Sequence, residues 1–284
     1  MIYLGIDFGT STNLVTRWNT EKGCPELVNM AEYGASSPVF PNIIFYDSPT
    51  NKFMGNSAIN KGKAYPENCF KEIKRRLEEG GFHQYIPSLD ADLNAEDIAT
   101  DIFSYIKSTV EKKYGGEKIG GVVVSVPFAF QQKERAKIQK AAERAGLTVL
   151  GLIEEPVAAA LSFGLAAKAE RGKRQKILMF DLGGGTFDVT VIEFVKQTDT
   201  RFNIEVLTTD GDKKLGGIDI DRIIVHKIIE KIKKEFPNYD PDNMSNKERN
   251  IEYLELEKAA LEVKLSISRY QALDGYRFCG FQHE

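Results

Sequence analysis

FDLGGGTFDV, at residues 180–189, places three consecutive glycines and a threonine between two segments that each carry an aspartate. The flanking apolar segments, residues 177–180 and 188–194, are rich in β-forming residues and predict a β-hairpin with a glycine-rich tip. Residues 2–18 repeat this plan, with DFGTST at positions 7–12 between two apolar runs. Two copies, separated by more than half of the chain, predict a duplicated α/β protein of two lobes.

The two hairpin tips predict a binding site for a polyphosphate. A loop of glycines and small hydroxyl residues leaves backbone N–H groups free and lets a polyanion approach them closely. Each tip follows an aspartate, Asp7 or Asp181, and Mg²⁺ is often held by only one or two carboxylates and several waters. A glycine tract can instead be a plain flexible turn, but the second aspartate-bearing copy disfavours that explanation. The chain has neither a GxxxxGK(S/T) loop nor a GxGxxG that opens a helix.

Composition and charge exclude several classes of function. The hydrophobic content of 42% is typical of a folded protein. The net charge of −3 provides no basic field for a nucleic acid or a membrane surface. Three cysteines, Cys24, Cys69 and Cys279, form no CxxC pair, which argues against a disulfide framework or a zinc site. The first strand is preceded by no signal-peptide pattern, and no apolar run is long enough to cross a bilayer. We therefore expect a cytoplasmic protein.

Periodic apolar residues predict most of the remaining elements. Residues at four-residue spacing from Ile98 to Val110 predict a helix that Asn94 or Asp97 caps. The apolar run 121–126 predicts a strand that ends at Pro127. Short strands are predicted within 38–54, and helices at 131–145 (ended by Gly146), 156–164, 219–236 and 248–266. Residues 168–176 are predicted to be a solvated connector between the lobes, and residues 268–284 show no clear period.

Five motifs resemble, in order, those of the heat-shock-seventy (DnaK-type) chaperones, a family of the actin-like ATPase superfamily. GIDFGTSTN at residues 5–13 is similar to the first phosphate motif of that family, and FDLGGGTFDV is nearly identical to the second. IEEPVAAAL at 153–161 closely matches the pattern NEPTAAAL. VSVP at 124–127, with residues 131–146, resembles the first connecting motif, and LGGIDID at 215–221 is similar to LGGxDFD. The resemblance extends from residue 1 to about residue 267.

The resemblance implies roles for individual residues. Asp7 and Asp181 would hold Mg²⁺ through its waters. Lys74 and Thr186 would lie beside the γ-phosphate, and Glu155 and Asp188 would orient or deprotonate the attacking water. The implied nucleotide contacts are Gly9, Thr10, Ser11, Thr12, Gly183, Gly184, Gly185, Gly216, Gly217 and Ser266.

Plainer explanations of some of these residues stay open on the sequence alone. Lys74 can be a solvated helix charge, and Glu155 a carboxylate that the dipole favours at a helix start. Pro127 and Arg135 correspond to the proline and arginine that couple the nucleotide state to the substrate domain in the family. Locally, however, Pro127 ends a strand and Arg135 is a polar helix residue.

The adenosine region departs from the family pattern in two ways. Ahead of Leu265 and Ser266, Glu262 and Val263 stand where the family usually has a basic residue. The later glycine-rich loop, VGGxSRxP, and the helix that returns to the first lobe do not occur in this sequence. Losing much of the adenine burial removes about 2–3 kcal/mol of binding free energy. A shortened second lobe also leaves sheet edges exposed.

These observations predict a two-lobed actin-like ATPase of the α/β class, with ribonuclease-H-like duplicated lobes and an incomplete second lobe. Lobe I is predicted to span residues 1–172, with an inserted subdomain at about 37–112. Lobe II is predicted to span 173–284, with a helical subdomain at about 219–284.

The predicted function is the binding of ATP or ADP with Mg²⁺, and a weak ATPase activity, in a chaperone of the heat-shock-seventy family. The implied partners are the nucleotide and co-chaperones of the J-domain and nucleotide-exchange types, without nucleic acid or membrane. Two alternatives stay open: a nucleotide-binding pseudo-ATPase or interaction module, and an actin-like filament-forming ATPase.

Overall fold

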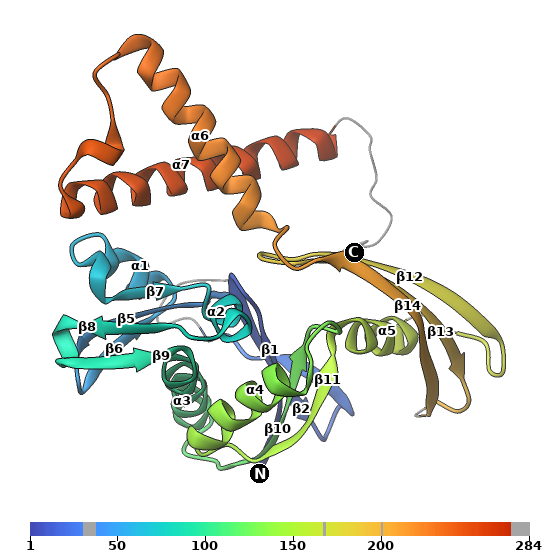
Figure 1. The fold of residues 1–284 in the computed structure, drawn as a ribbon. Coiled ribbons are helices and arrows are strands. Elements are labelled where there is room, and N and C mark those ends of the chain that lie inside the picture. Colours follow the sequence, from blue (N-terminus) through green and yellow to red (C-terminus); the bar gives the residue numbers. More distant parts are fainter. Residues whose placement is uncertain (31–37, 167–168, 200, 274–284) are drawn as a thin grey trace. The chain divides into compact units, whose positions relative to one another are not determined.

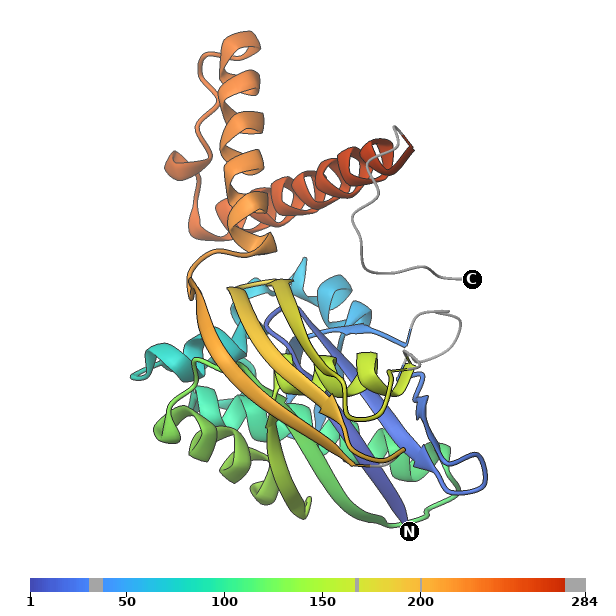
Figure 2. The ribbon, with the colours of Figure 1, turned by 90° about the vertical axis from the view of Figure 1, so that its right-hand side faces the viewer.

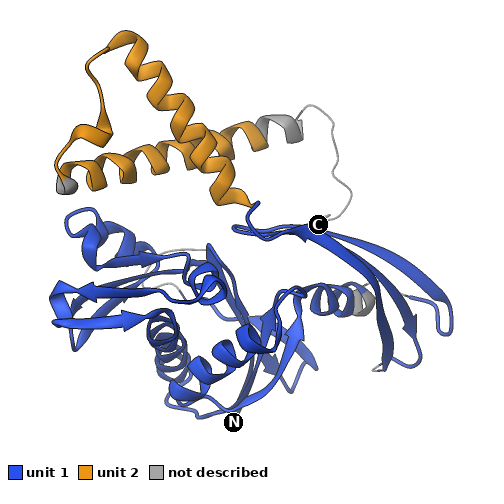
Figure 3. Ribbon diagram, in the orientation of Figure 1, with its two compact units in different colours: residues 1–215 blue, residues 216–284 orange. Residues whose placement is uncertain are grey.

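A computed structural model describes residues 1–30, 38–166, 169–199 and 201–273. The chain divides into two compact units, residues 1–215 and 216–284 (Figure 3), and each is described separately below. The predicted lobe boundary near residue 172 and the predicted insertion at 37–112 are not tested by this division and stay predictions.

A six-stranded mixed sheet forms the centre of the first unit (Figure 1). Strand β1 lies between β10, to which it is parallel, and β2, to which it is antiparallel. The strands along the path are β11 (Val149–Glu154), β10 (Ile119–Val126), β1 (Ile2–Phe8), β2 (Thr12–Asn19) and β3 (Cys24–Leu27), with β4 (Phe40–Pro41) paired to β2. The first predicted hairpin is therefore β1 and β2.

Two amphipathic helices cover one face of this sheet. They are α3 (Ala95–Lys113) and α4 (Gln132–Arg144). The four apolar residues that predicted α3 are completely buried, and a capping box between Asn94 and Asp97 begins the helix. Phe103 of α3 stacks on Phe8 of β1 with 5.0 Å between ring centroids. Gly146, with a φ of 76°, ends the helical region after α4 as predicted.

Smaller elements occupy residues 43–94. A three-stranded sheet has the order β6 (Asn51–Met54), β5 (Ile43–Ser48) and β7 (Cys69–Lys71), and β8 (His83–Ile86) pairs with β9 (Ala91–Asn94). The helices of this region are α1 (Asn56–Gly62) and α2 (Ile73–Glu79), with 3₁₀ turns at Pro66–Asn68 and Pro87–Leu89. The short strands predicted within 38–54 are confirmed as β4, β5 and β6.

A second sheet contains the other predicted hairpin. Strands β12 (Arg174–Leu182), β13 (Phe187–Lys196) and β14 (Phe202–Asp212) are antiparallel neighbours (Figure 2). Helix α5 (Glu155–Ala166) packs against the sheet and buries Thr190, Ile192 and Phe194 of β13. The connector was predicted to span residues 168–176. Strand β12 already begins at Arg174, so the predicted C-terminal end of the connector was wrong. Residues 167 and 168 lie outside the described part.

The second unit is a helical pair. Helix α6 (Gly217–Glu235) and helix α7 (Asn246–Leu273) are joined through a 3₁₀ turn at Pro241–Asn243. Val225, Leu256 and Ala260 form its small core, with Ile224, Ile228 and Ile232 packed against them. Helix α7 continues seven residues beyond the predicted end at 266. Within the described residues, no helix combines the length and apolar character that a membrane span requires.

Candidate functional site

The tips of the two hairpins contact each other within the first unit. A Cβ atom built on Gly184 would lie 2.1 Å from Ser11 Oγ, and one built on Gly185 would lie 2.7 Å from Thr10 Cγ2. Such separations show that the glycine backbone of the second tip packs directly on the side chains of the first. The two tips are therefore apposed in the structure, as a polyphosphate site shared by both of them requires.

A cavity of about 380 Å³ lies where the tips meet. Most of the predicted site residues of the first unit line it, together with residues that the sequence analysis did not assign. The lining residues are Asp7, Gly9, Thr10, Ser11, Thr12, Lys74, Ser125, Glu155, Ala158, Ala159, Asp181, Gly183, Gly184 and Thr186.

Local contacts explain the shape of each tip. A Cβ on Gly9 would lie 2.2 Å from the carbonyl oxygen of Thr12, so this turn requires glycine. Asn42, fully buried, donates from Nδ2 to the carbonyl of Gly9 at 2.6 Å and from its backbone N–H to the carbonyl of Ser11 at 2.8 Å. In the second tip, the N–H of Gly183 donates to the carbonyl of Thr186 at 2.9 Å.

Three aspartates belong to the hairpins. Asp7 lies near the end of β1, where Ser125 Oγ donates to its Oδ1 at 2.7 Å. Asp181 and Asp188 are directly opposite each other in the ladder of β12 and β13. Partial desolvation and the charge of Asp7 raise the pKa of Asp181, and desolvation and the charge of Asp181 raise the pKa of Asp188. The hydroxyl of Thr186 opposes the shift at Asp188.

Lys74 and Glu155 form an ion pair in the wall of the cavity. The chain enters α2 through Glu72, whose φ of 61° lies in the left-handed region. Lys74 Nζ then lies 2.6 Å from Glu155 Oε1, and only 7% of the Lys74 side chain is exposed. Lys74 is thus not a solvated surface charge. Burial raises the pKa of Glu155, although the charge of Lys74 acts in the opposite direction.

The arrangement suits a polyanion together with a divalent cation. Glu155, Asp181 and Asp7 repel one another electrostatically, and Lys74 supplies a single positive charge among them. A divalent cation would balance the remaining charge, and the tip amides are typical donors to phosphate oxygens. Among the described residues, no three acidic, histidine or cysteine side chains are close enough together to hold a metal ion directly. Asp7 and Asp181 both line the cavity, and their part in holding Mg²⁺ through its waters stays a prediction.

Three predicted nucleotide contacts belong to the second unit. Gly216 and Gly217 lie at the start of α6, and Ser266 is exposed on α7. Their part in binding stays a prediction. The sequence analysis assigned no role to Lys264, which donates to the carbonyl of Gly217 at 3.0 Å and to Asp221 at 2.7 Å, and so fastens α7 to the start of α6.

The sequence analysis also missed three residues that hold the site in shape. Asn42 supports the first tip, as described above. Arg75 Nη2 donates to the carbonyl of Gly185 at 2.7 Å and so joins α2 to the second tip. Ser125 holds Asp7, and it is the one hydroxyl residue within the otherwise apolar run 121–126. That isolated hydroxyl was a usable signal in the sequence.

Arg135 has more partners than a solvated helix residue needs. Its guanidinium donates to Glu154 at 2.9 Å and to the carbonyl of Phe130 at 2.8 Å. Glu154 immediately precedes Glu155, and the ring of Phe130 lies 5.9 Å from Lys74 Nζ. Arg135 is therefore connected to the surroundings of the ion pair, and its coupling role stays a prediction.

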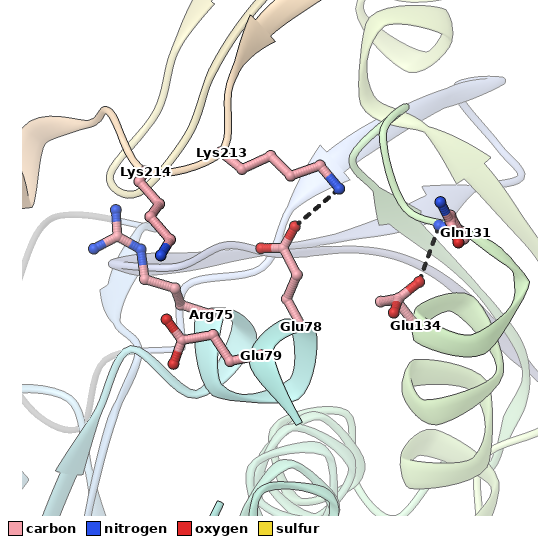
Figure 4. Close-up of a pocket in the computed structure, with 7 residues that line it drawn as sticks. All are labelled: Arg75, Glu78, Glu79, Gln131, Glu134, Lys213 and Lys214. Carbon is pink, nitrogen blue, oxygen red and sulfur yellow. Dashed lines mark hydrogen bonds and ion pairs between the residues drawn. The ribbon is translucent and has the colours of Figure 1, made fainter. Parts of the chain in front are cut away.

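A second cavity of about 280 Å³ is lined by charged residues of α2, the start of α4 and the loop after β14, together with the uncharged Gln131 (Figure 4). Across it, Lys213 Nζ lies 3.5 Å from Glu78 Oε1. Burial raises the pKa of Glu78, and Lys213 opposes this shift. No sequence motif pointed to this cavity.

Comparison with known proteins identifies the family. The family model described as Hsp70 protein matches residues 79–276. The chain is 34% identical over 267 residues to the chaperone protein DnaK of Ureaplasma urealyticum, which covers 94% of this chain and 40% of that protein. It is 36% identical over 238 residues to DnaK of Metamycoplasma hominis, covering 84% of this chain and 37% of the relative.

DnaK of Thermotoga maritima is 34% identical over 232 residues, which cover 82% of this chain and 36% of that protein. The chain thus spans about 40% of the length of these relatives. On these grounds, the chain belongs to the Hsp70 protein family.

Proposed function

We propose that the first unit binds MgATP between the two hairpin tips and hydrolyses it, as part of the nucleotide-binding domain of a heat-shock-seventy chaperone. The contact of the two glycine-rich tips above a cavity lined by Asp7, Asp181, Lys74 and Glu155 is the observation that carries this proposal. Membership of the Hsp70 family supports it and disfavours a filament-forming ATPase.

The tips account for binding of the phosphates. Backbone N–H groups of residues 9–12 and 184–186 would donate to phosphate oxygens, each charge-assisted bond contributing about 1.5–3 kcal/mol. The N–H of Gly183 donates to Thr186 and so shapes the second tip. Asp7 and Asp181 would hold Mg²⁺ through its waters, and the bound ion would neutralise charge on the phosphates.

Lys74 and the carboxylates account for hydrolysis. Phosphoryl transfer spreads negative charge over the γ-phosphoryl oxygens, so a fixed cation beside them stabilises the transition state. Lys74 would provide that cation, with Thr186 beside it. Glu155 would accept a hydrogen bond from the attacking water, and its raised pKa makes it a better proton acceptor than an ordinary glutamate. Asp188, on β13 just after the second tip, would orient the same water, although it is not among the residues that line the cavity.

A pseudo-ATPase or interaction module is the second candidate, because Glu262 and Val263 depart from the family pattern in the adenosine region. We further propose cytoplasmic location and co-chaperone partners of the J-domain and nucleotide-exchange types, all of which rest on the family.

Calorimetry with ATP and ADP, beside a phosphate-release assay, tests the proposal. We expect binding of both nucleotides and slow release of phosphate by the wild-type chain. Turnover should be abolished in Lys74→Ala and in Thr186→Ala, while Thr20→Ala, an exposed change in the turn after β2, should keep it. Binding without release would favour the pseudo-ATPase. Undiminished turnover in both site variants would refute the site assignment.

A further inference from the structure

We infer that Ser125 is a positioning residue for Asp7, fixing the orientation in which this carboxylate meets the waters of a bound divalent cation. This inference rests on the proposed MgATP site. The donor–acceptor distance from Ser125 Oγ to Asp7 Oδ1 is 2.7 Å, and both residues line the cavity between the tips.

The strand register makes this contact a fixed part of the sheet. β1 and β10 are parallel neighbours, and Asp7 pairs with Ser125 at the last matched position of their ladder. Val122, Val124 and Val126 of β10 are buried on the core side, so Ser125, at an alternate position, faces the other side of the sheet with Asp7. A hydroxyl placed there has a carboxylate as its direct neighbour.

The hydrogen bond limits what the carboxylate of Asp7 can do. A serine hydroxyl has one proton to donate, and here Asp7 Oδ1 accepts it. Rotation of the carboxylate would break this bond, so Oδ2 keeps a constant direction for a further donor, such as a metal-bound water. Removing a partner that orients a direct metal ligand typically weakens metal affinity by about 10- to 100-fold. Asp7 would act through a metal-bound water, so the effect of Ser125 should lie at the lower end of that range.

A simpler explanation is that the bond only satisfies a half-buried hydroxyl. Threonine and valine at position 125 separate the two explanations, because they have nearly the same shape and only threonine can donate. Relative to serine, both variants carry one additional branch on Cβ, so strain from that added methyl group affects them equally. Valine also has a methyl group in place of the hydroxyl. Thr190→Val provides a matched control, since it removes a hydroxyl from β13 that bonds Thr209 and does not line the cavity.

The test measures free Mn²⁺ by electron paramagnetic resonance during titration of the protein–ADP complex, with ADP affinity in EDTA measured separately. We expect Ser125→Thr and Thr190→Val to bind Mn²⁺ as the wild type does, and Ser125→Val to bind it up to about tenfold more weakly. Metal-free ADP affinity should be the same in all four proteins.

Wild-type Mn²⁺ affinity in both Ser125→Thr and Ser125→Val would overturn the inference while leaving the proposed function intact. An equal loss in both variants would also overturn it, because the shape of the side chain and not its hydroxyl would then be responsible. If the folded wild-type chain bound neither ADP nor Mn²⁺, the proposed function would fail, and this inference with it.

Discussion

The ammonium group of Lys74 lies 2.6 Å from the carboxylate of Glu155, which is 81 positions further along the chain. One residue belongs to α2 and the other begins α5, and their side chains are 7% and 18% exposed. The pair therefore fastens two elements together as well as placing two charges in the cavity. Removing either charge leaves the other one largely buried without its partner.

Substitution of Lys74 should accordingly destabilise the protein without ligand. Breaking a buried pair from one side typically costs about 3–5 kcal/mol, and some exposure of Glu155 should reduce this to about 2–3 kcal/mol in Lys74→Met. Urea denaturation at pH 7 measures the loss. The double variant Lys74→Met/Glu155→Gln should recover most of it, because no unpaired charge remains. Strictly additive effects of the two single substitutions would show that the pair is not coupled.

Asp181→Asn should have the opposite effect on stability. Because the pKa of Asp181 is raised in the folded protein, its contribution to stability is present at low pH and lost as the pH rises through the raised pKa. At pH 7 the ionised group, partly desolvated and repelled by Asp7, therefore costs stability, and an amide of the same shape removes that cost. Thermal denaturation should show a melting temperature a few degrees above that of the wild type.

Mg²⁺ and ADP should stabilise Asp181→Asn less than they stabilise the wild type. With saturating Mg²⁺ and ADP, the wild type should be stabilised more than Asp181→Asn, because the variant lacks one carboxylate toward the cation. A melting temperature of the ligand-free variant at or below the wild-type value would contradict the electrostatic argument. Such trade-offs between stability and function are typical of binding sites.

Gly184→Ala should separate the two hairpin tips. The added Cβ would lie 2.1 Å from Ser11 Oγ, so the tips must move or their backbone must deform. Overpacking of this kind costs about 1–3 kcal/mol, and we expect both the free energy of unfolding and the affinity for ADP to fall. Urea denaturation and calorimetry measure the two quantities.

Two further glycines of the first unit serve as controls. Gly151→Ala adds a Cβ with no atom within 4 Å, and Gly183→Ala adds one whose nearest neighbour is at 3.4 Å. Both should be tolerated far better than Gly184→Ala. Ser11→Gly in the Gly184→Ala background removes the two nearest obstructing atoms, leaving the backbone nitrogen of residue 11 at 3.2 Å, and should restore part of the lost stability. Similar losses in all three alanine variants would mean that glycine flexibility, not the close approach of the tips, determines the effect.

Local signals explain which parts of the fold the sequence could predict. Each hairpin has its strand-forming residues and its tip within about twenty positions, and α3 has its apolar period and its capping box in one segment. Strand β14 was not predicted, although Phe202, Ile204 and Val206 alternate with polar residues there. Helix α7 was predicted too short, because helix propagation continues where no glycine or proline stops it.

The candidate site was predictable only in part, because its support comes from pairings between distant segments. Asp7 and Asp181 could be found from their own motifs. Ser125 contacts Asp7 across 118 positions, Asn42 contacts Gly9 across 33, and Arg75 contacts Gly185 across 110. Each contact depends on strand register or on helix placement, which no local pattern determines. The role of Lys74 was predicted from the family resemblance, whereas its burial needed the structure.

The ion pair between Glu78 and Lys213 predicts a pH dependence of stability. Burial raises the pKa of Glu78 above its ordinary value of 4.5. The folded protein therefore retains this proton to higher pH than the unfolded chain does, and the resulting stabilisation is lost as the pH rises through the raised pKa. Lys213 limits that shift by favouring the ionised form. In Lys213→Met the pKa of Glu78 should rise further, and the loss of stability should extend to higher pH than in the wild type.

Urea denaturation between pH 4 and pH 8 tests this prediction, with Glu78→Gln as the matched variant. Glu78→Gln should make the free energy of unfolding less dependent on pH than it is in the wild type, because the titration of Glu78 is removed. The other carboxylates with raised pKa values are common to both proteins. Lys213 also lowers the pKa of Asp188, so Lys213→Met alone combines two effects. In the double variant Glu78→Gln/Lys213→Met, the missing lysine charge can affect only the titration of Asp188. The difference in free energy of unfolding between this double variant and Lys213→Met, taken at each pH, therefore gives the contribution of Glu78 alone. If that difference has no pH dependence, Glu78 does not titrate as this ion pair requires.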